Sequence, residues 1–287
     1  MTLKRLLTPV LFAALMAIVS GCGEYQQILK SQDYDLWYTK GLEYYGKGDY
    51  VRASNLLSPL ITVSRGTERA ETVMITYAYA LHKSGDNMMG GHYFREFVKT
   101  FPGSERCEES QFMSGYCYYL MSPKPRLDQS DTEAAINEFQ LFLNLYPNSE
   151  RVDEAVRCMN EMRDKLVYKS YLNARLYFDL GNYMGNNYRS AVIAAQNSLK
   201  RFPDTQYREE LSFLILEAKF IQAEHSVIEK KGERYRDTID EYYAFQNEFP
   251  ESKYSSKALS ILETSQKSLR NLEKRGLLVE DKDNYNG

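Results

Sequence analysis

The hydrophobic positions of the chain follow a helical pattern that is interrupted at four similar tetrapeptides. These read Phe101-Pro102-Gly103-Ser104, Tyr146-Pro147-Asn148-Ser149, Phe202-Pro203-Asp204-Thr205 and Phe249-Pro250-Glu251-Ser252. Before three of them, aromatic residues lie four and seven positions upstream, as Phe97 and Phe94 do before Phe101. Offsets of four and seven lie on one face of a helix. The pattern therefore predicts amphipathic helices that end at these tetrapeptides.

Each tetrapeptide also predicts the start of another helix. Proline cannot continue a helix interior, and it moves the residue before it out of the α region. The Ser or Thr two residues after the proline can cap the next helix by accepting a backbone N–H. The copies begin at positions 101, 146, 202 and 249, so their spacings are 45, 56 and 47 residues. Such spacings are typical of repeated helix pairs.

The first repeat matches the tetratricopeptide pattern, in which small residues let two paired helices approach closely. Trp37, Gly41 and Tyr44 stand at the Trp, Gly and Tyr positions of its first helix, and Ala53 stands at the small position of its second helix. Lys47-Gly48-Asp49-Tyr50 is the expected turn between them. The sequence predicts an all-α, tetratricopeptide-like helical-repeat solenoid of about five helix pairs plus a C-terminal capping helix.

The N-terminus has the features of a targeting segment. Lys4 and Arg5 precede an apolar run that is too short for a good membrane span. Val19-Ser20-Gly21-Cys22 then resembles the bacterial lipobox, which implies cleavage before Cys22 and a covalent lipid on its thiol. The alternatives are an ordinary signal peptide and a membrane anchor. Gly23 is not the Asp that retains many lipoproteins at the inner membrane, which favours the outer membrane.

These signals divide the chain into five segments. Residues 1–21 are predicted to be a lipoprotein signal peptide, and residues 22–31 a lipidated tether. Residues 32–148 hold repeats one to three, and residues 149–275 hold repeats four and five with the capping helix. The tail, 276–287, is expected to be disordered because it is polar and charged.

An insertion of about eight residues, at 121–129, lengthens the third repeat beyond the tetratricopeptide pattern. It contains two prolines, so a stiff loop is expected. Ser130 and Glu133 after it are expected to form a capping box. Two interpretations of Arg126, Asp128 and Gln129 stay open: they brace the helix that starts at Ser130, or they contact a partner and set the relation between the two halves of the chain.

Charge and candidate chemistry exclude several classes of function. Loss of Lys4 and Arg5 with the signal peptide leaves 34 Lys and Arg against 39 Asp and Glu, a net charge of −5. No basic tail or RNA-binding signature is present, so nucleic acid is not expected as a partner. No HExxH, GxSxG or P-loop pattern occurs, and we predict a non-enzyme without a metal or cofactor. Cys107, Cys117 and Cys158 permit at most one disulfide, and buried thiols are expected.

The combination of a lipobox, about five tetratricopeptide-like pairs and aromatic-Pro-x-Ser junctions resembles the BamD family. The more specific features are the segment Pro125-Arg126-Leu127-Asp128-Gln129-Ser130 and the unbroken helix expected after Tyr146-Pro147-Asn148-Ser149. The resemblance covers essentially all of the mature chain. The chain departs from the general tetratricopeptide pattern in the first helices of repeats four and five.

The resemblance implies a lipoprotein of the outer membrane, anchored on the periplasmic side, that acts in the β-barrel assembly machine. In that family the N-terminal repeats receive unfolded outer-membrane proteins. The C-terminal repeats dock on the periplasmic domain of the barrel-forming subunit. An alternative is a lipid-anchored, helical-repeat protein that binds glycans or peptidoglycan, although such proteins are usually longer and carry large insertions.

The first helices of repeats one to three predict a groove, because tetratricopeptide stacks line their concave face with these helices. The inward positions hold Tyr38, Tyr45, Ile75, Tyr79, His82, Phe112, Tyr116 and Tyr119. Within each helix they are three, four or seven residues apart and share one face. Aromatic grooves suit extended segments with aromatic ends, such as the terminal strand of an outer-membrane barrel. The alternative is that these rings pack between neighbouring helices.

Overall fold

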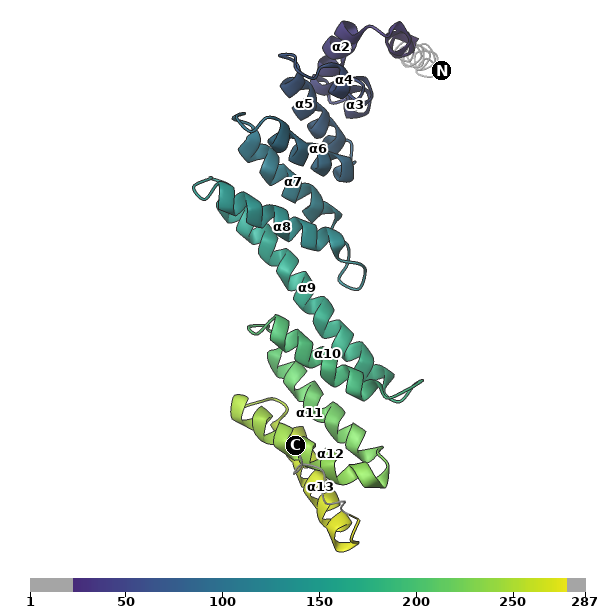
Figure 1. Cartoon of the computed structure of the whole chain (residues 1–287), viewed down its shortest axis with the longest axis vertical. Helices are drawn as coiled ribbons and strands as arrows, with labels where there is room; N and C mark the ends of the chain where they lie inside the picture. Colours follow the sequence, from purple (N-terminus) through teal and green to yellow (C-terminus); the bar gives the residue numbers. More distant parts are fainter. Residues whose placement is uncertain (1–22, 278–287) are drawn as a thin grey trace, which may run out of the picture. The chain divides into compact units, whose positions relative to one another are not determined.

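The computed structural model describes residues 23–277, in which every regular element is a helix (Figure 1). The helices divide into two compact units. The first unit comprises the described chain up to Pro123 together with Asp128–Met162, and the second comprises Lys124–Leu127 and the chain from Arg163. The prediction of an all-α, tetratricopeptide-like fold is confirmed.

Antiparallel helix pairs make up each unit, and each helix packs on the next along the chain (Figure 1). The first unit holds α2 (Tyr34–Gly46), α3 (Tyr50–Leu57), α4 (Leu60–Val63), α5 (Ala70–Lys83), α6 (Asn87–Thr100), α7 (Cys107–Met121) and α8 (Ser130–Leu145). The long helix α9 (Val152–Leu180) begins in the first unit and ends in the second. The second unit continues with α10 (Asn187–Arg201), α11 (Arg208–Glu224), α12 (Ile228–Glu248) and α13 (Ser255–Lys274).

The aromatic residues four and seven positions before the tetrapeptides form the core, as their spacing predicts. The largest fully buried side chains include Phe94, Phe97, Phe139, Phe142 and Phe245. Burial of each such ring stabilises the fold by about 1.5–3 kcal/mol. The small residues at the repeat positions are also needed, because they let the paired helices approach closely. A Cβ atom added to Gly115 of α7 would lie 3.0 Å from the Phe139 ring of α8, so a larger residue would separate this pair.

All four tetrapeptides form the same hydrogen-bonded junction. The side-chain oxygens of Ser104, Ser149, Thr205 and Ser252 accept the N–H two residues later, at distances of 3.1, 3.0, 3.2 and 2.9 Å. The following helix starts one residue beyond that N–H. The hydroxyls accept a backbone N–H as predicted, but the N-cap residues of α7, α11 and α13 are Arg106, Tyr207 and Tyr254, so the prediction that the Ser or Thr itself caps the next helix is wrong.

Three of these hydroxyls also donate a hydrogen bond to a carboxylate in the first helix of their own repeat. Ser104 donates to Glu71 at 2.6 Å, Ser149 to Glu108 at 2.5 Å, and Ser252 to Glu209 at 2.6 Å. Each glutamate lies in the first turn of its helix, where the helix dipole favours a negative charge. One hydroxyl therefore joins the end of a repeat both to its own first helix and to the next repeat.

Two details of the expected organisation differ in the structure. Residues 23–31, expected to be a tether, are helical and carry buried side chains. Ser130 is the first residue of α8 rather than its cap, so the expected capping box with Glu133 is wrong. Its N–H is accepted by the Asp128 carboxylate at 2.9 Å, which takes the place of a Ser cap. The predicted signal peptide, Cys22 and residues 278–287 lie outside the described residues.

Replacing Ser252 with Ala removes both hydrogen bonds of one junction. We expect the free energy of unfolding to fall by about 1–2 kcal/mol, because the Tyr254 N–H loses its acceptor and the Glu209 carboxylate loses its donor. Ser256→Ala, at an exposed position of the same helix, is the matched control and should change stability by less than about 0.5 kcal/mol. Equal effects of the two variants in urea unfolding would show that the junction hydroxyl is unimportant.

Candidate functional site

The predicted groove residues separate into a buried set and a half-buried set. Ile75 and Phe112 are only 2% and 1% exposed, so the expectation that they line an open groove is wrong. The other six predicted residues keep part of their surface: Tyr38, Tyr45, Tyr79, His82, Tyr116 and Tyr119.

Phe112 packs against Phe139 and Phe142 of α8 at 5.7 and 5.5 Å, and residues at the repeat junctions lie over some of the inward rings as well. The Arg151 guanidinium, directly before α9, lies 4.7 Å from the centre of the Phe112 ring. Arg69, directly before α5, covers Tyr38 in the same way at 4.8 Å. In the second unit, the ring of Tyr254 stacks on Phe213 at 4.3 Å. In α2, α7 and α11, an inward ring is thus contacted by the residue that precedes the first helix of the next repeat.

The five half-buried residues of the predicted groove other than Tyr38 form what we call the aromatic face: Tyr45, Tyr79, His82, Tyr116 and Tyr119. The ring of Tyr116 stacks on Tyr119 at 5.7 Å and lies 6.3 Å from His82. Tyr79 packs edge-on against the buried Phe94 at 4.8 Å. Repeats two and three therefore share one surface of partly exposed rings.

Hydrogen bonding holds the end of this face in place. The Tyr119 hydroxyl donates to a Glu161 carboxylate oxygen of α9 at 2.6 Å, and this bond, aided by burial, raises the pKa of Tyr119 to about 12. Arg157 pairs with the same carboxylate group at 3.1 Å. The phenol therefore stays protonated at physiological pH, and its ring has little freedom to turn away.

Glu109 of α7 brings a negative charge to the centre of the aromatic face. Burial is the main cause that raises the pKa values of Tyr45 and Tyr79. The negative charge of Glu109 adds to the increase at both residues, and Tyr50 adds to the increase at Tyr45. The Glu109 carboxylate is 48% exposed and lies 4.0 Å from the Arg151 guanidinium, the outer limit for an ion pair. Rings, a carboxylate and a guanidinium thus lie together across three repeats. Such a surface can bind apolar side chains and also hydrogen-bond to a peptide backbone.

A cysteine, a histidine and an asparagine also meet at this face, but they do not form a catalytic triad. The Nδ1 atom of His82 lies 2.9 Å from the Asn87 side-chain oxygen and 3.6 Å from the Cys117 Sγ atom. One nitrogen cannot both take a proton from the thiol and be oriented by the amide. Cys117 is fully buried, and burial raises the pKa of its thiol to about 12. Cys107 and Cys158 are likewise buried free thiols, as expected.

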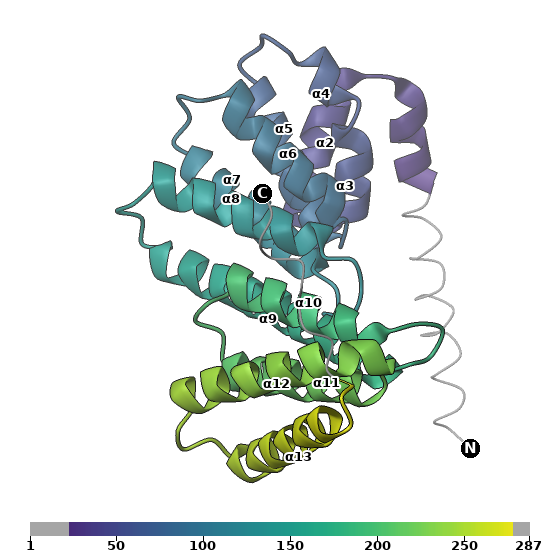
Figure 2. The same ribbon diagram turned by 60° about the horizontal axis from the view of Figure 1, so that its bottom comes forward.

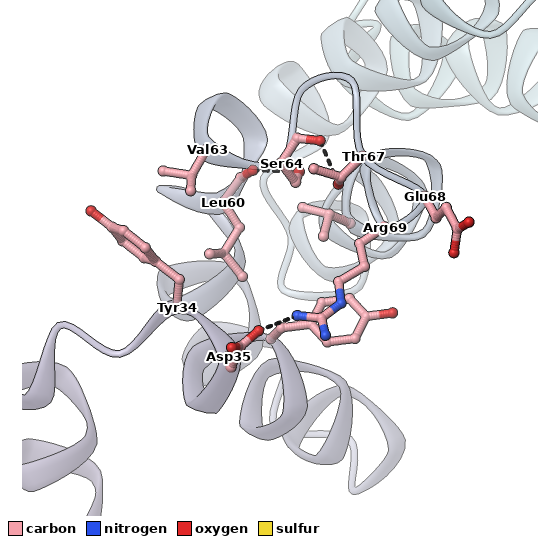
Figure 3. Close-up of a pocket in the computed structure, with 10 residues that line it drawn as sticks. Tyr34, Asp35, Leu60, Val63, Ser64, Thr67, Glu68 and Arg69 are labelled. Carbon is pink, nitrogen blue, oxygen red and sulfur yellow. Dashed lines mark hydrogen bonds and ion pairs between the residues drawn. The ribbon is translucent and has the colours of Figure 1, made fainter.

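Tyr38 lines a separate pocket of about 340 Å³ between α2, α4 and the start of α5 (Figure 3). Arg69 pairs with Asp35 above the Tyr38 ring, and the close-up shows this pair at one side of the pocket. Tyr34 and Val63 are about half exposed at 48% and 47% and add apolar surface. The sequence pattern does not mark this pocket, because one of its walls is α4, a single helical turn outside the repeat pattern.

The insertion residues contact both the start of α8 and helix α9, where Lys169 donates a hydrogen bond to the Leu127 carbonyl oxygen at 2.7 Å. Besides the contact of Asp128 with Ser130, the buried Gln129 accepts a hydrogen bond from the Thr132 hydroxyl at 2.7 Å. Arg126 is exposed. The bracing interpretation fits Asp128 and Gln129, while contact of Arg126 with a partner stays a prediction.

Comparison with known proteins places the chain in a family. The family model YfiO, described as an outer membrane lipoprotein, matches residues 30–218. The chain belongs to the YfiO family. The match spans every helix that contributes to the aromatic face and to the pocket of Figure 3.

Relatives of this YfiO-family chain carry the name outer membrane protein assembly factor BamD. A relative from Haemophilus influenzae is 23% identical over 219 residues, covering 71% of this chain and 80% of its own. One from Pasteurella multocida is 24% identical over 229 residues, covering 75% and 84%. A BamD relative from Aquifex aeolicus is 28% identical over 244 residues, covering 83% and 78%.

Among solved structures, the tetratricopeptide domain of P58(IPK) is similar with 17% identity and a TM-score of 0.38, covering 87% of this YfiO-family chain and 69% of that domain. The low score adds nothing to the fold described above. Within residues 23–277, none of the helices combines the length and apolar character that a membrane span needs.

Proposed function

We propose that this protein is a lipid-anchored scaffold, facing the periplasm, for the assembly of outer-membrane β-barrel proteins. Its first unit binds extended segments of unfolded outer-membrane proteins, and its second unit docks on the periplasmic domain of the barrel-forming subunit. Its membership of a family of outer membrane lipoproteins and the assembly-factor names of its relatives support this proposal.

The observation that carries the proposal is the aromatic face of the first unit. Tyr116 and Tyr119 are partly exposed and stacked, and Tyr119 is held by its hydrogen bond to Glu161, so little conformational freedom is lost when a ligand binds. Strands of outer-membrane barrels alternate apolar and polar side chains. An extended segment can therefore direct alternate apolar side chains to the rings while its polar ones stay in water. Ring contacts tolerate many sequences, which suits a scaffold with many substrates.

Exposed apolar residues in the second unit support the docking role. The turn between α9 and α10 exposes Tyr183 by 68% and Met184 by 90%, and the turn before α12 exposes Val227 by 62%. The corresponding turn in the first repeat, at residues 47–49, is polar. Met184 also has a φ of 55°, a conformation that favours glycine. A large, exposed apolar residue in that conformation supports contact with a partner at this turn.

Truncation of either stacked ring should weaken peptide binding. We expect Tyr116→Ala and Tyr119→Ala each to reduce affinity by about 1 kcal/mol or more, roughly fivefold, for a peptide matching the terminal strand of an outer-membrane barrel. Isothermal titration calorimetry with the mature protein in detergent measures this. Tyr183→Ala, an exposed ring of the second unit, is the control and should bind like the parent. Parental affinity of both ring variants, or loss of their fold, would exclude this face as the site.

A second experiment tests the docking role. We expect Tyr183→Ser combined with Met184→Ser to reduce several-fold the amount of barrel-forming subunit that co-purifies from solubilised outer membrane. Lys257→Ser, at an exposed position of α13, is the control and should leave this amount unchanged. Undiminished recovery with the double variant contradicts docking through this turn. Retention on peptidoglycan in place of a barrel partner would favour the glycan-binding alternative.

A further inference from the structure

The segment immediately after the predicted lipidation site is folded onto the first helix pair. Residues 23–31 form a helix, here called the N-terminal helix, which lies beside α2 and α3 (Figure 2). Tyr25 and Ile28 are only 9% and 5% exposed and pack with Leu56 of α3, which is fully buried. The Trp37 indole N–H of α2 donates to the Ile28 carbonyl oxygen at 2.7 Å.

Further contacts fix the part of this helix nearest to Cys22. The Tyr25 ring meets Tyr44 of α2 edge-on at 5.9 Å, and the Arg52 guanidinium of α3 lies over both rings, at 5.2 and 5.7 Å. Lys40 pairs with Glu24 at 3.4 Å. Hydrophobic burial, an indole hydrogen bond and cation–π contacts thus all join this helix to the first repeat.

These contacts change the expected reach of the lipid anchor. A flexible tether of ten residues would have a root-mean-square length of about 17 Å. Because the helix already includes Gly23, only one peptide unit of about 3.8 Å separates Cys22 from folded structure. The first unit is therefore joined to the residue that is predicted to carry the acyl chains by one peptide unit rather than by a flexible tether of ten residues.

We infer that the N-terminal helix is a rigid stalk that holds the first unit directly at the phospholipid surface. This inference rests on the proposed lipid anchor at Cys22. Acyl chains keep the anchored residue at the membrane interface. A rigid connection then restricts both the height and the orientation of the first unit, including its aromatic face. The partner of the stalk is the bilayer surface itself, and its role is to position bound segments near the membrane.

Energy transfer in proteoliposomes tests the inference on the acylated protein. A donor dye is attached to Lys83→Cys, at the exposed end of α5, while the native thiols at 107, 117 and 158 are buried. Acceptor-labelled phospholipid marks the bilayer surface. We expect a narrow donor-lifetime distribution for the parent. Insertion of ten Gly and Ser residues between Cys22 and Gly23 should broaden that distribution and lower the mean transfer efficiency.

Substitutions in the stalk provide the matched comparison at constant chain length. Tyr25→Ser with Ile28→Ser should broaden the distribution as the insertion does. Gln26→Ser with Gln27→Ser, on the exposed side of the same helix, should leave it unchanged. If the variant with Tyr25→Ser and Ile28→Ser unfolds, the insertion variant alone tests the inference, because the insertion leaves every described contact intact. Equal distributions for the parent and the insertion variant would overturn the inference.

Vesicle flotation separates failure of the stalk from failure of the anchor. The parent should float with the vesicles, and Cys22→Ser should not, because it lacks the thiol for acylation. A parent that stays at the bottom of the gradient overturns both the anchor and the stalk. A parent that floats, but whose lifetimes do not respond to the insertion, overturns the stalk alone.

Discussion

One hydroxyl group at each repeat junction determines how successive repeats are joined. Ser149, for example, accepts the backbone N–H of Arg151 and donates to Glu108 at the start of the same repeat. The proline before it ends the preceding helix, and the hydroxyl sets where the next one begins. Arg151 is thereby placed over Phe112, so a local backbone constraint decides which aromatic ring is covered. The packing of neighbouring repeats and the composition of their exposed surface both follow from this junction.

This packing separates the buried rings of the core from the accessible rings of the surface. Phe112 contributes to the core, whereas Tyr116, one helical turn further on, keeps an accessible ring beside Tyr119. The two units then differ in what they expose. The first presents rings together with Glu109, which suits extended chains, and the second presents apolar turns such as that of Met184, which suit a folded partner. The division proposed for the two units has its physical basis in these differences.

The sequence was sufficient for the fold but only partly sufficient for the site. Proline positions and aromatic spacing are local signals, and they predicted the helix pairs and the burial of Phe94 and Phe97. The burial of Phe112 was missed because the residues around it, Phe139, Phe142 and Arg151, follow it by 27 to 39 residues, beyond the insertion. The folding of residues 23–31 was missed for the same reason, since Tyr25 and Ile28 are stabilised by α2 and α3. Periodicity assigns a residue to a helix face, but it does not identify the residue that covers it.

Photo-crosslinking in living cells tests most directly whether the aromatic face receives unfolded barrel proteins. A benzophenone amino acid in place of Tyr116 would report what contacts this face, and one in place of Tyr243, 54% exposed on α12, would serve as the control. The account predicts adducts between position 116 and newly synthesised outer-membrane proteins, which disappear when their synthesis stops. Such adducts at position 243 with none at position 116 would contradict it.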